Sequence, residues 1–442
     1  MKLRARTSHQ TTPLECIPNC SVTSPEPNDP RATWDKTALE ANTLRRGKAF
    51  FAAIGNESPS VFNKNWWIGK LMDWSMSNED FKIQLFRFID VLPSLTTEEM
   101  LVRHIQEYFS QAESVPAVLR LGAKSTGLAG KLSMNVLGRT IRKNLEMMAL
   151  QFIIGGTVAE TVKHLNRLRK KQGFAFTLDI LGEAVVSESE AQAYVANYLE
   201  LLDGVGQAQA GWQALGEGSP PTLDWSAAPK INLSIKPSAL YPHADPADFD
   251  GTVVQMLERI RPVYRKVRDL GGFLCIDTEM CKLRHIIIEL YKRLRSDAEF
   301  KDYPHLGLAM QCYLKDSDAD LDHLLTWSRD TGLAISIRLV KGAYWDYEVL
   351  HARQNGREVP VYTVKQETDL AFERFSEKIL RNHDICHFAV ASHNARSVCA
   401  VMEMAAMLKV PKERIEYQAL YGMAEPFRNA LLKMTGQVRL YC

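Results

Sequence analysis

The sequence predicts an α/β protein: a parallel, TIM-like β/α barrel preceded by a helical arm and a small helical domain. From about residue 173 onwards, eight short apolar runs alternate with seven segments of helical periodicity, which is typical of parallel strands joined by crossover helices. Polar residues follow seven of these runs. Because the strand ends of a barrel meet at one mouth, where active sites form, this recurrence also predicts a site.

The composition is that of a globular protein with a sizeable core. The chain has 442 residues, of which 46% are hydrophobic and 24% charged, and its net charge is +2. So small a net charge excludes a general attraction to nucleic acid or membranes. No apolar run approaches the roughly 18 residues of a membrane-spanning helix, and the eight cysteines lack a framework spacing. We expect a cytoplasmic protein that neither binds nucleic acid nor inserts stably into a membrane.

The chain divides into three predicted parts. Residues 1–35 are rich in Pro, Ser, Thr and Asn, lack periodicity and are predicted to be disordered. Residues 36–150 show helical periodicity, clearest at 62–76 and 81–91, and form the predicted arm and helical domain. Residues 151–442 form the predicted barrel.

Local signals refine this division. Thr-Thr-Glu-Glu at 96–99 and Ser-Glu-Ser-Glu at 187–190 are capping boxes, and 157–171 is predicted to be an amphipathic helix with a basic end. Two glycine-containing stretches, 122–131 and 204–206, lack the spacing of a nucleotide-binding loop. The predicted strands are 174–179, 231–235, 273–276, 306–311, 334–339, 386–391, 415–418 and 438–441. One predicted helix begins at the second capping box. The others span about 248–269, 280–296, 318–329, 366–381, 395–408 and 423–434.

The most informative stretch is 338–346, Arg-Leu-Val-Lys-Gly-Ala-Tyr-Trp-Asp, at the end of the fifth predicted strand. Its two cations can hold anionic groups, Gly342 lets a ligand approach the backbone, and Tyr344 and Trp345 offer flat faces. Polar residues occupy the corresponding places after other strands, namely Lys236, Asp277, Glu279, Gln311, His393, Asn394, Gln418 and Tyr441.

This stretch resembles the fifth-strand motif of the flavin-dependent proline dehydrogenases, above all the proline dehydrogenase domain of the bacterial bifunctional proline utilisation A proteins. The resemblance runs from about residue 174 to 442, and the N-terminal half is similar to the arm and helical domain of those proteins. The remaining motifs follow in the family's order: Ser-Ile-Lys-Pro-Ser-Ala-Leu-Tyr at 234–241, Ile-Asp-Thr-Glu at 276–279, Met-Gln-Cys-Tyr at 310–313, Val-Tyr-Thr-Val-Lys-Gln-Glu-Thr-Asp at 361–369, Ala-Ser-His-Asn at 391–394 and Glu-Tyr-Gln-Ala-Leu-Tyr-Gly-Met at 416–423.

The resemblance implies the first step of proline catabolism. The family oxidises L-proline to Δ1-pyrroline-5-carboxylate by hydride transfer to FAD and passes the electrons to a membrane quinone. Carried over residue by residue, the expected proline pocket consists of Lys236, Asp277, Leu339, Tyr344, Leu420 and Tyr441. The expected FAD contacts are Gln311, Arg338, Val340, Gly342, Ala343, Trp345, Thr363, Lys365, Thr368, His393, Asn394 and Gln418.

Each of these residue types suits its expected task. Lys236 would hold the substrate carboxylate by a charge-assisted contact, and Arg338 would stabilise the negative charge that develops on the reduced flavin. The leucines and tyrosines would enclose the proline ring in an apolar slot that excludes water. No side chain needs to act as a covalent nucleophile, and no metal is expected.

One departure from the family concerns the last helix. The family continues after the eighth strand into a helix with paired arginines that bind the proline carboxylate, whereas this sequence ends at Tyr-Cys, 441–442. We interpret the chain as truncated before that helix. Each lost charged hydrogen bond typically costs about 1.5–3 kcal/mol, so we expect weak proline binding and slow turnover.

Several alternatives stay open at this stage. The chain could be a truncated, inactive or weakly active fragment that still binds FAD, or Lys236 could form a Schiff base in a barrel aldolase. A transcriptional role is disfavoured because residues 1–50 lack a strand followed by two basic helices. A metal site at 383–387 is disfavoured because that segment spans a helix end and a strand start. The oligomeric state and peripheral contact with the inner face of the membrane are left open.

Overall fold

The computed structural model describes the barrel and parts of the N-terminal half. The predicted disordered tail up to residue 34, the predicted helix at 62–76 and the glycine-containing stretch at 122–131 lie outside the described residues, as does most of 81–91. The structure describes residues 35–55, 83–84, 87–88, 91, 94–95, 97–109, 152–182 and 185–442.

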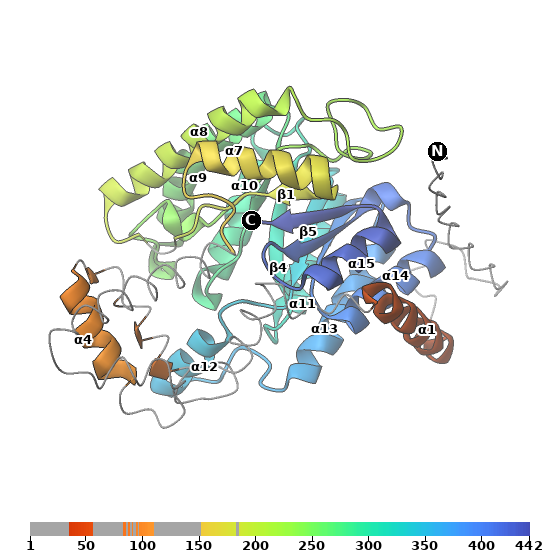
Figure 1. Ribbon diagram of the computed structural model, residues 1–442. Helices are drawn as coiled ribbons and strands as arrows, with labels where there is room; N and C mark the ends of the chain where they lie inside the picture. Colours follow the sequence, from red (N-terminus) through yellow and green to blue (C-terminus); the bar gives the residue numbers. More distant parts are fainter. Residues whose placement is uncertain are drawn as a thin grey trace, which may run out of the picture.

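Eight parallel strands form the wall of the barrel (Figure 1). Their order in the sheet is β1-β8-β7-β6-β5-β4-β3-β2, so strands that follow one another in the chain are neighbours in the wall. Their residues are mostly buried, as expected for a parallel sheet covered on both faces. The strands are β1 (Ala175–Thr177), β2 (Asn232–Ile235), β3 (Phe273–Ile276), β4 (Leu306–Gln311), β5 (Ile335–Val340), β6 (Cys386–Ala391), β7 (Ile415–Leu420) and β8 (Val438–Tyr441).

Contacts between the first two strands close the wall. Leu178, directly after β1, forms a parallel bridge with Leu233 of β2. The Leu178 N–H donates to the carbonyl of Asn232 at 2.9 Å, and the Leu178 carbonyl accepts from the N–H of Ser234 at 2.7 Å. The strands therefore form a nearly closed ring, which confirms the predicted parallel barrel.

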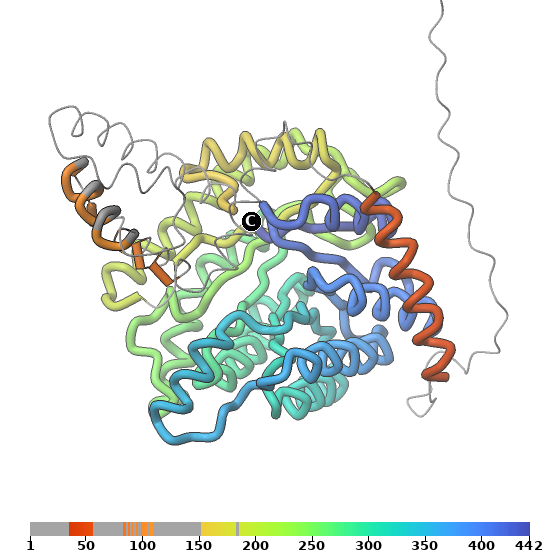
Figure 2. The backbone as a smooth tube through the Cα atoms, turned by 60° about the horizontal axis from the view of Figure 1, so that its bottom comes forward, coloured from red at the N-terminus to blue at the C-terminus, as the bar shows by residue number. Residues whose placement is uncertain are grey.

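Helices cover the outside of this ring (Figures 1 and 2). No helix in the described part of the chain has both the length and the apolar character needed to cross a bilayer. The longer helices of the barrel are α7 (Val158–Arg167), α8 (Glu188–Gln209), α9 (Phe249–Asp269), α10 (Arg284–Ser296), α11 (Ser317–Thr331), α12 (Trp345–Gln354), α13 (Lys365–Arg381), α14 (Ala395–Met407) and α15 (Glu425–Thr435). Short turns of helix are η2 (Leu168–Gln172), η3 (Pro237–Ala239), η4 (Pro246–Asp248), η5 (Cys281–Leu283) and η6 (Lys412–Arg414).

The two predicted capping boxes differ in outcome. Ser187 caps α8 as predicted, because its hydroxyl accepts from the Glu190 N–H at 3.3 Å. The Glu190 carboxylate reaches back as in a capping box, but it accepts from the N–H of Val186, one residue before the cap, at 2.9 Å. In α4 (Glu98–Phe109), the cap lies one residue later than the predicted start, since the Met100 N–H donates to Thr97 Oγ1 at 3.2 Å.

The connection between β5 and β6 is also different from the prediction. It contains two helices, α12 and α13, whereas the sequence predicted only the second. Helix α12 buries only Glu348, Val349 and Ala352, so its apolar periodicity is weak. It begins at Trp345, in a group of aromatic residues that gives no clear signal for a helix start. Strand β7 also continues to Leu420, two residues beyond its predicted end at Gln418.

The N-terminal arm is a helix, α1 (Lys36–Ile54), that packs on α14 and α15 (Figure 2). Asp35 caps it, because the Asp35 carboxylate accepts from the N–H groups of Thr37 and Ala38 at 3.0 and 3.1 Å. The predicted arm therefore lies directly against the helices that surround the barrel.

A buried ion pair occupies the interior of the barrel. Arg439 of β8 is 1% exposed, and its Nε donates to the Glu416 carboxylate of β7 at 2.8 Å. The same guanidinium donates to the carbonyl of Phe176 at 2.6 Å, so it joins β7, β8 and β1. Both charges also line a cavity of about 280 Å³ that extends from the N-terminal ends of the strands up to Arg338 and Gln418.

We expect the Glu416→Gln substitution to destabilise the barrel by about 3 kcal/mol or more, because it leaves the buried Arg439 guanidinium without its counter-charge. Chemical denaturation followed by circular dichroism measures this change. The matched control is Glu358→Gln, which removes the exposed partner of Lys315 and should leave the unfolding midpoint unchanged. Equal midpoints for the two variants would contradict the prediction.

Candidate active site

A cavity of about 430 Å³ opens at the C-terminal mouth of the barrel. Its walls come from the ends of seven strands and the loops that follow them, so side chains far apart in the sequence converge there. Most residues of the predicted site line it: Lys236, Asp277, Gln311, Arg338, Val340, Gly342, Ala343, Tyr344, His393, Gln418, Leu420 and Tyr441. Lys341 lines it as well, although it was not among the site residues that the family resemblance implied.

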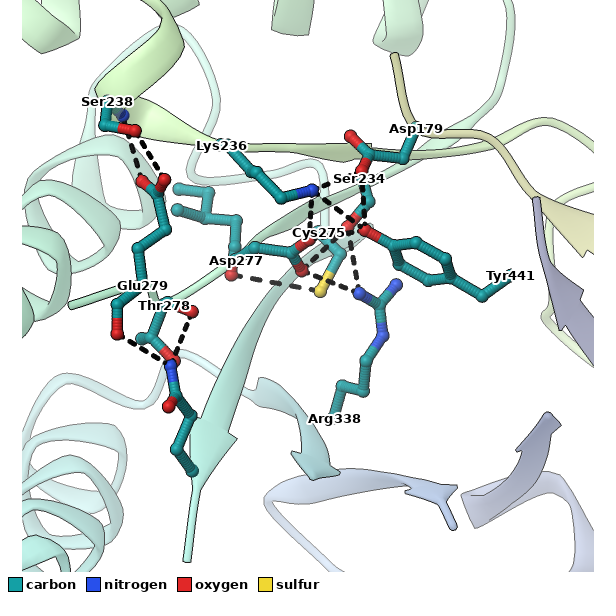
Figure 3. A network of polar contacts seen from close by, with 12 residues as sticks. Asp179, Ser234, Lys236, Ser238, Cys275, Asp277, Thr278, Glu279, Arg338 and Tyr441 are labelled. Carbon is teal, nitrogen blue, oxygen red and sulfur yellow. Dashed lines mark hydrogen bonds and ion pairs between the residues drawn. The ribbon is translucent and has the colours of Figure 1, made fainter. Parts of the chain in front are cut away.

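The Asp277 carboxylate is the centre of a polar network at this mouth (Figure 3). One of its oxygens accepts from Arg338 Nη1 at 2.7 Å and from Ser234 Oγ at 2.8 Å. The other accepts from the Tyr441 hydroxyl at 2.7 Å. Arg338 also donates to Ser234 Oγ at 2.8 Å, so four strands are joined at one carboxylate.

Arg338 and Tyr441 each keep one protonation state. Burial by itself would lower the pKa of Arg338, but Cys275, Asp277 and Tyr441 raise it above its ordinary value, so the guanidinium stays charged. Burial, followed by the charges of Asp277 and Asp179, raises the pKa of Tyr441 far above its usual range. The phenol therefore remains a hydrogen-bond donor.

Asp179 is a residue of this network that the sequence analysis missed. It follows β1 and pairs with Lys236, and it lies 2.9 Å from the Tyr441 hydroxyl (Figure 3). Burial raises the pKa of Asp179 to about 6, although the Lys236 ammonium acts in the opposite direction. The sequence contained a signal for it, because Asp179 is the polar residue at the end of the first strand. That strand end was the only one to which no site residue had been assigned.

Two further side chains present hydrogen-bonding atoms to the cavity. Gln311 donates from Nε2 to the carbonyls of Thr278 and Glu279 at 2.6 and 2.9 Å, and no described residue donates to its buried Oε1. His393 Nε2 accepts from the Leu420 N–H at 2.8 Å, so a neutral ring carries its proton on Nδ1, for which the described residues offer no acceptor. Arg338 Nε, a third buried atom of the lining, also has no acceptor among the described residues, so the site holds one orphaned acceptor and two orphaned donors.

Five predicted cofactor contacts lie outside the cavity lining. Trp345 is 40% exposed and donates from Nε1 to the Tyr362 carbonyl at 2.8 Å, whereas Thr368 is buried in α13. Asn394 caps α14 by accepting from the Ser397 N–H at 3.1 Å. The others are the exposed residues Thr363 and Lys365.

One acidic residue, Asp369, contacts basic and amide side chains from three segments of the chain. Asp369 pairs with Lys341, and its second oxygen accepts from Lys365 at 2.7 Å and from Asn394 Nδ2 at 3.3 Å. Two of these partners are predicted cofactor contacts, and the third, Lys341, lines the cavity. The structure therefore brings them to the rim of the mouth.

Leu339 does not reach the cavity. Side chains alternate along β5, so Arg338 and Val340 face the cavity, whereas Leu339 is fully buried in the core between the wall and the helices. Gly342 does line the cavity, but its neighbour explains the glycine: at φ 146°, an added Cβ would lie 2.5 Å from the Tyr313 ring.

The fold and this cavity define the class: a β/α-barrel protein with a charged, partly apolar ligand site at the C-terminal mouth. Within the described residues, no three His, Cys, Asp or Glu side chains gather as metal ligands. The chain belongs to the proline dehydrogenase family, whose family model, "Proline dehydrogenase", matches residues 161–442. A second model, "Proline utilization A N-terminal domain", matches residues 40–152.

Individual relatives agree with this assignment. The bifunctional protein PutA of Escherichia coli K12 is 30% identical over 312 residues, which cover 70% of this chain and 22% of that protein. The proline dehydrogenase of Deinococcus radiodurans is 23% identical over 300 residues, covering 68% of this chain and 82% of the relative. The chain thus spans less than a quarter of the bifunctional relative.

A solved structure supports the same fold. Proline utilization A from Bdellovibrio bacteriovorus, inactivated by N-propargylglycine, superposes with a TM-score of 0.80 at 36% identity and covers 91% of this chain and 39% of that one. The corresponding protein from Corynebacterium freiburgense has a TM-score of 0.57 at 28% identity, covering 67% of this chain and 29% of that one.

We expect the Asp179→Asn substitution to abolish a carboxyl titration near pH 6. The pKa of Asp179 in the folded protein, about 6, exceeds its ordinary value of 3.8, so the folded state binds more protons between these values. The contribution of Asp179 to stability is therefore complete below pH 3.8 and is lost as the pH rises to 6. ¹³C NMR of the aspartate carboxyl groups measures the titration.

The control for this titration is Asp318→Asn. Lys378 and Arg374 hold the pKa of Asp318 below its ordinary value against the effect of burial, so this variant should keep the signal that titrates near pH 6. Persistence of that signal in the Asp179 variant would show that another group produces it.

Proposed function

We propose that the chain is an FAD-dependent proline dehydrogenase that oxidises L-proline to Δ1-pyrroline-5-carboxylate. The observation that carries this proposal is the pairing of two cations with two carboxylates beside an apolar wall at one barrel mouth, in a member of the proline dehydrogenase family. Such a balanced set of charges suits a zwitterion, which brings one charge of each sign and leaves the total unchanged.

On the substrate side, we assign the carboxylate of proline to Lys236. Its ammonium lies 3.9 Å from Asp277 and pairs with Asp179, so it can reach a ligand in the cavity while its own charge stays compensated. Tyr344, Leu420 and Tyr441 supply the wall for the ring. Leu339 is not part of this wall, because its side chain lies in the hydrophobic core and does not line the cavity.

On the cofactor side, we assign FAD to the cavity and its rim. The orphaned acceptor of Gln311 and the orphaned donor of His393 fit a flavin ring, which carries both donors and acceptors at its edge. Lys341 and Lys365 are cations that suit a pyrophosphate. The remaining proposed contacts are Arg338, Val340, Gly342, Ala343, Trp345, Thr363, Thr368, Asn394 and Gln418.

The chain contributes positioning and electrostatics to the proposed reaction. FAD supplies the hydride acceptor when bound. Arg338 holds a fixed positive charge at the base of the cavity, which stabilises negative charge without reorganisation during the reaction. Tyr441 stays protonated, and the apolar walls exclude water from the ring of the substrate.

A membrane quinone is the electron acceptor that we propose, and its support is the family resemblance alone. Contact with the membrane surface would then be peripheral and transient. Reoxidation of the reduced protein by a soluble quinone tests the acceptor.

The Schiff-base alternative gains no support, because Lys236 lies in an ion pair that suits a fixed cation rather than a nucleophilic amine.

The proposed function predicts that the purified protein takes up FAD and that L-proline bleaches the flavin under anaerobic conditions. Visible absorbance measures both events. Cyclopentanecarboxylate is the control ligand, since it has the ring and the carboxylate but no nitrogen to form the C=N bond. Failure to bind added FAD contradicts the cofactor assignment, and FAD binding without bleaching by L-proline contradicts the proposed oxidation.

We expect the Lys236→Met substitution to weaken L-proline binding about tenfold to a hundredfold, because a charged hydrogen bond is worth about 1.5–3 kcal/mol. FAD affinity should stay unchanged. Titration calorimetry with each ligand separates the two effects. Lys315→Met, which removes a cation paired with exposed Glu358, should change neither affinity.

A further inference from the structure

A row of aromatic rings joins the N-terminal arm to the mouth of the barrel. Phe50 of α1 is fully buried, and its ring centroid lies 4.9 Å from that of Phe427 in α15. Phe427 in turn stacks on His393, with centroids 5.3 Å apart and an interplanar angle of 18°. His393 lines the mouth cavity. A residue of the outer arm is thus two ring contacts away from the site.

Ion pairs hold the arm in this position. Arg46 of α1 pairs with the buried Glu403 of α14. Glu40 of α1 accepts two hydrogen bonds from Arg396 of α14, at 2.7 and 2.9 Å. The two contacts lie on the same helix as Phe50 and both engage α14, so they restrict sliding and rotation of α1. Phe50 is therefore held at a defined place against α15.

The state of His393 depends on the ring that covers it. Because its Nε2 accepts from the Leu420 N–H, the neutral ring must place its proton on Nδ1. Burial is the main reason that the pKa of His393 lies below its ordinary value, and the nearby Arg428 lowers it further. Phe427 supplies part of that burial by lying flat on the imidazole. Water at this face would favour the charged ring and release the Leu420 contact.

We propose that Phe50 is a positioning residue for His393: through Phe427 it keeps the imidazole neutral, with its Nδ1–H available to a ligand in the cavity. Removing the Phe50 ring leaves a void against which Phe427 can tilt, since buried aromatic rings lose their support when a neighbour is truncated. The arm would then set the ligand affinity of a site that it never touches. The identity of that ligand, FAD, rests on the proposed function, whereas the state of His393 does not.

The adjacent residues Phe50 and Phe51 provide a matched test. They share residue type and helix, but Phe50 is fully buried and Phe51 is 64% exposed. We expect Phe50→Ala to weaken FAD binding about five- to tenfold, to raise the pKa of His393 towards its ordinary value and to mix its tautomers. Phe51→Ala should change none of these. Fluorescence titration measures the FAD affinity, and ¹⁵N NMR of the histidine rings measures the pKa and the tautomer.

Phe50→Leu completes the series. It keeps a large apolar side chain and should give smaller changes in the same direction, and it decides the question if Phe50→Ala does not fold. Variants that unfold at lower temperature but keep wild-type His393 signals and FAD affinity would overturn the proposal, because Phe50 would then have only a structural role. If the wild-type protein binds no FAD, the proposed function fails, and the His393 signals alone test this inference.

Discussion

The Asp277 carboxylate is the contact on which the mouth of the barrel depends. It accepts hydrogen bonds from β2, β5 and β8, through Ser234, Arg338 and Tyr441. A buried carboxylate without donors, or a buried guanidinium without its counter-charge, costs several kcal/mol. Each partner is therefore needed by the others, and the ends of β2, β3, β5 and β8 are held at a fixed spacing before any ligand arrives.

The second ion pair of the mouth extends this arrangement to the first strand. Asp179 and Lys236 stand beside Asp277 and share the Tyr441 hydroxyl with it. Positive and negative charges are thus interleaved in a small volume, so the side chains are oriented by one another rather than by water. Preorganised charges of this kind act on a reacting group without having to rearrange during the reaction.

Support for the mouth comes from both below and outside. In the interior, the pair of Arg439 and Glu416 joins the last two strands, and Gln418 donates from Nε2 to that same carboxylate at 2.6 Å. Gln418 also lines the mouth cavity, so the interior pair and the mouth share this side chain. On the outside, α15 supports His393 through the stacked ring of Phe427, and α1 supports Phe427 through the tilted ring of Phe50. The geometry of the site therefore depends on the strands of the barrel wall and on the helices that cover them.

The sequence alone determined the eight strands, most of the crossover helices and the set of polar residues at the strand ends, because apolar runs, turn signals and capping boxes are local properties of the chain. It missed α12, whose buried face is too small to produce a clear periodicity. The sequence places Asp179 after the first strand, but only the tertiary structure decided that it contacts Tyr441, because this follows from β8 pairing beside β1. The tertiary structure also decided that Leu339 faces the core and that Phe50 lies behind His393. Strand alternation and contacts between distant segments depend on how the barrel closes, and no local pattern records that.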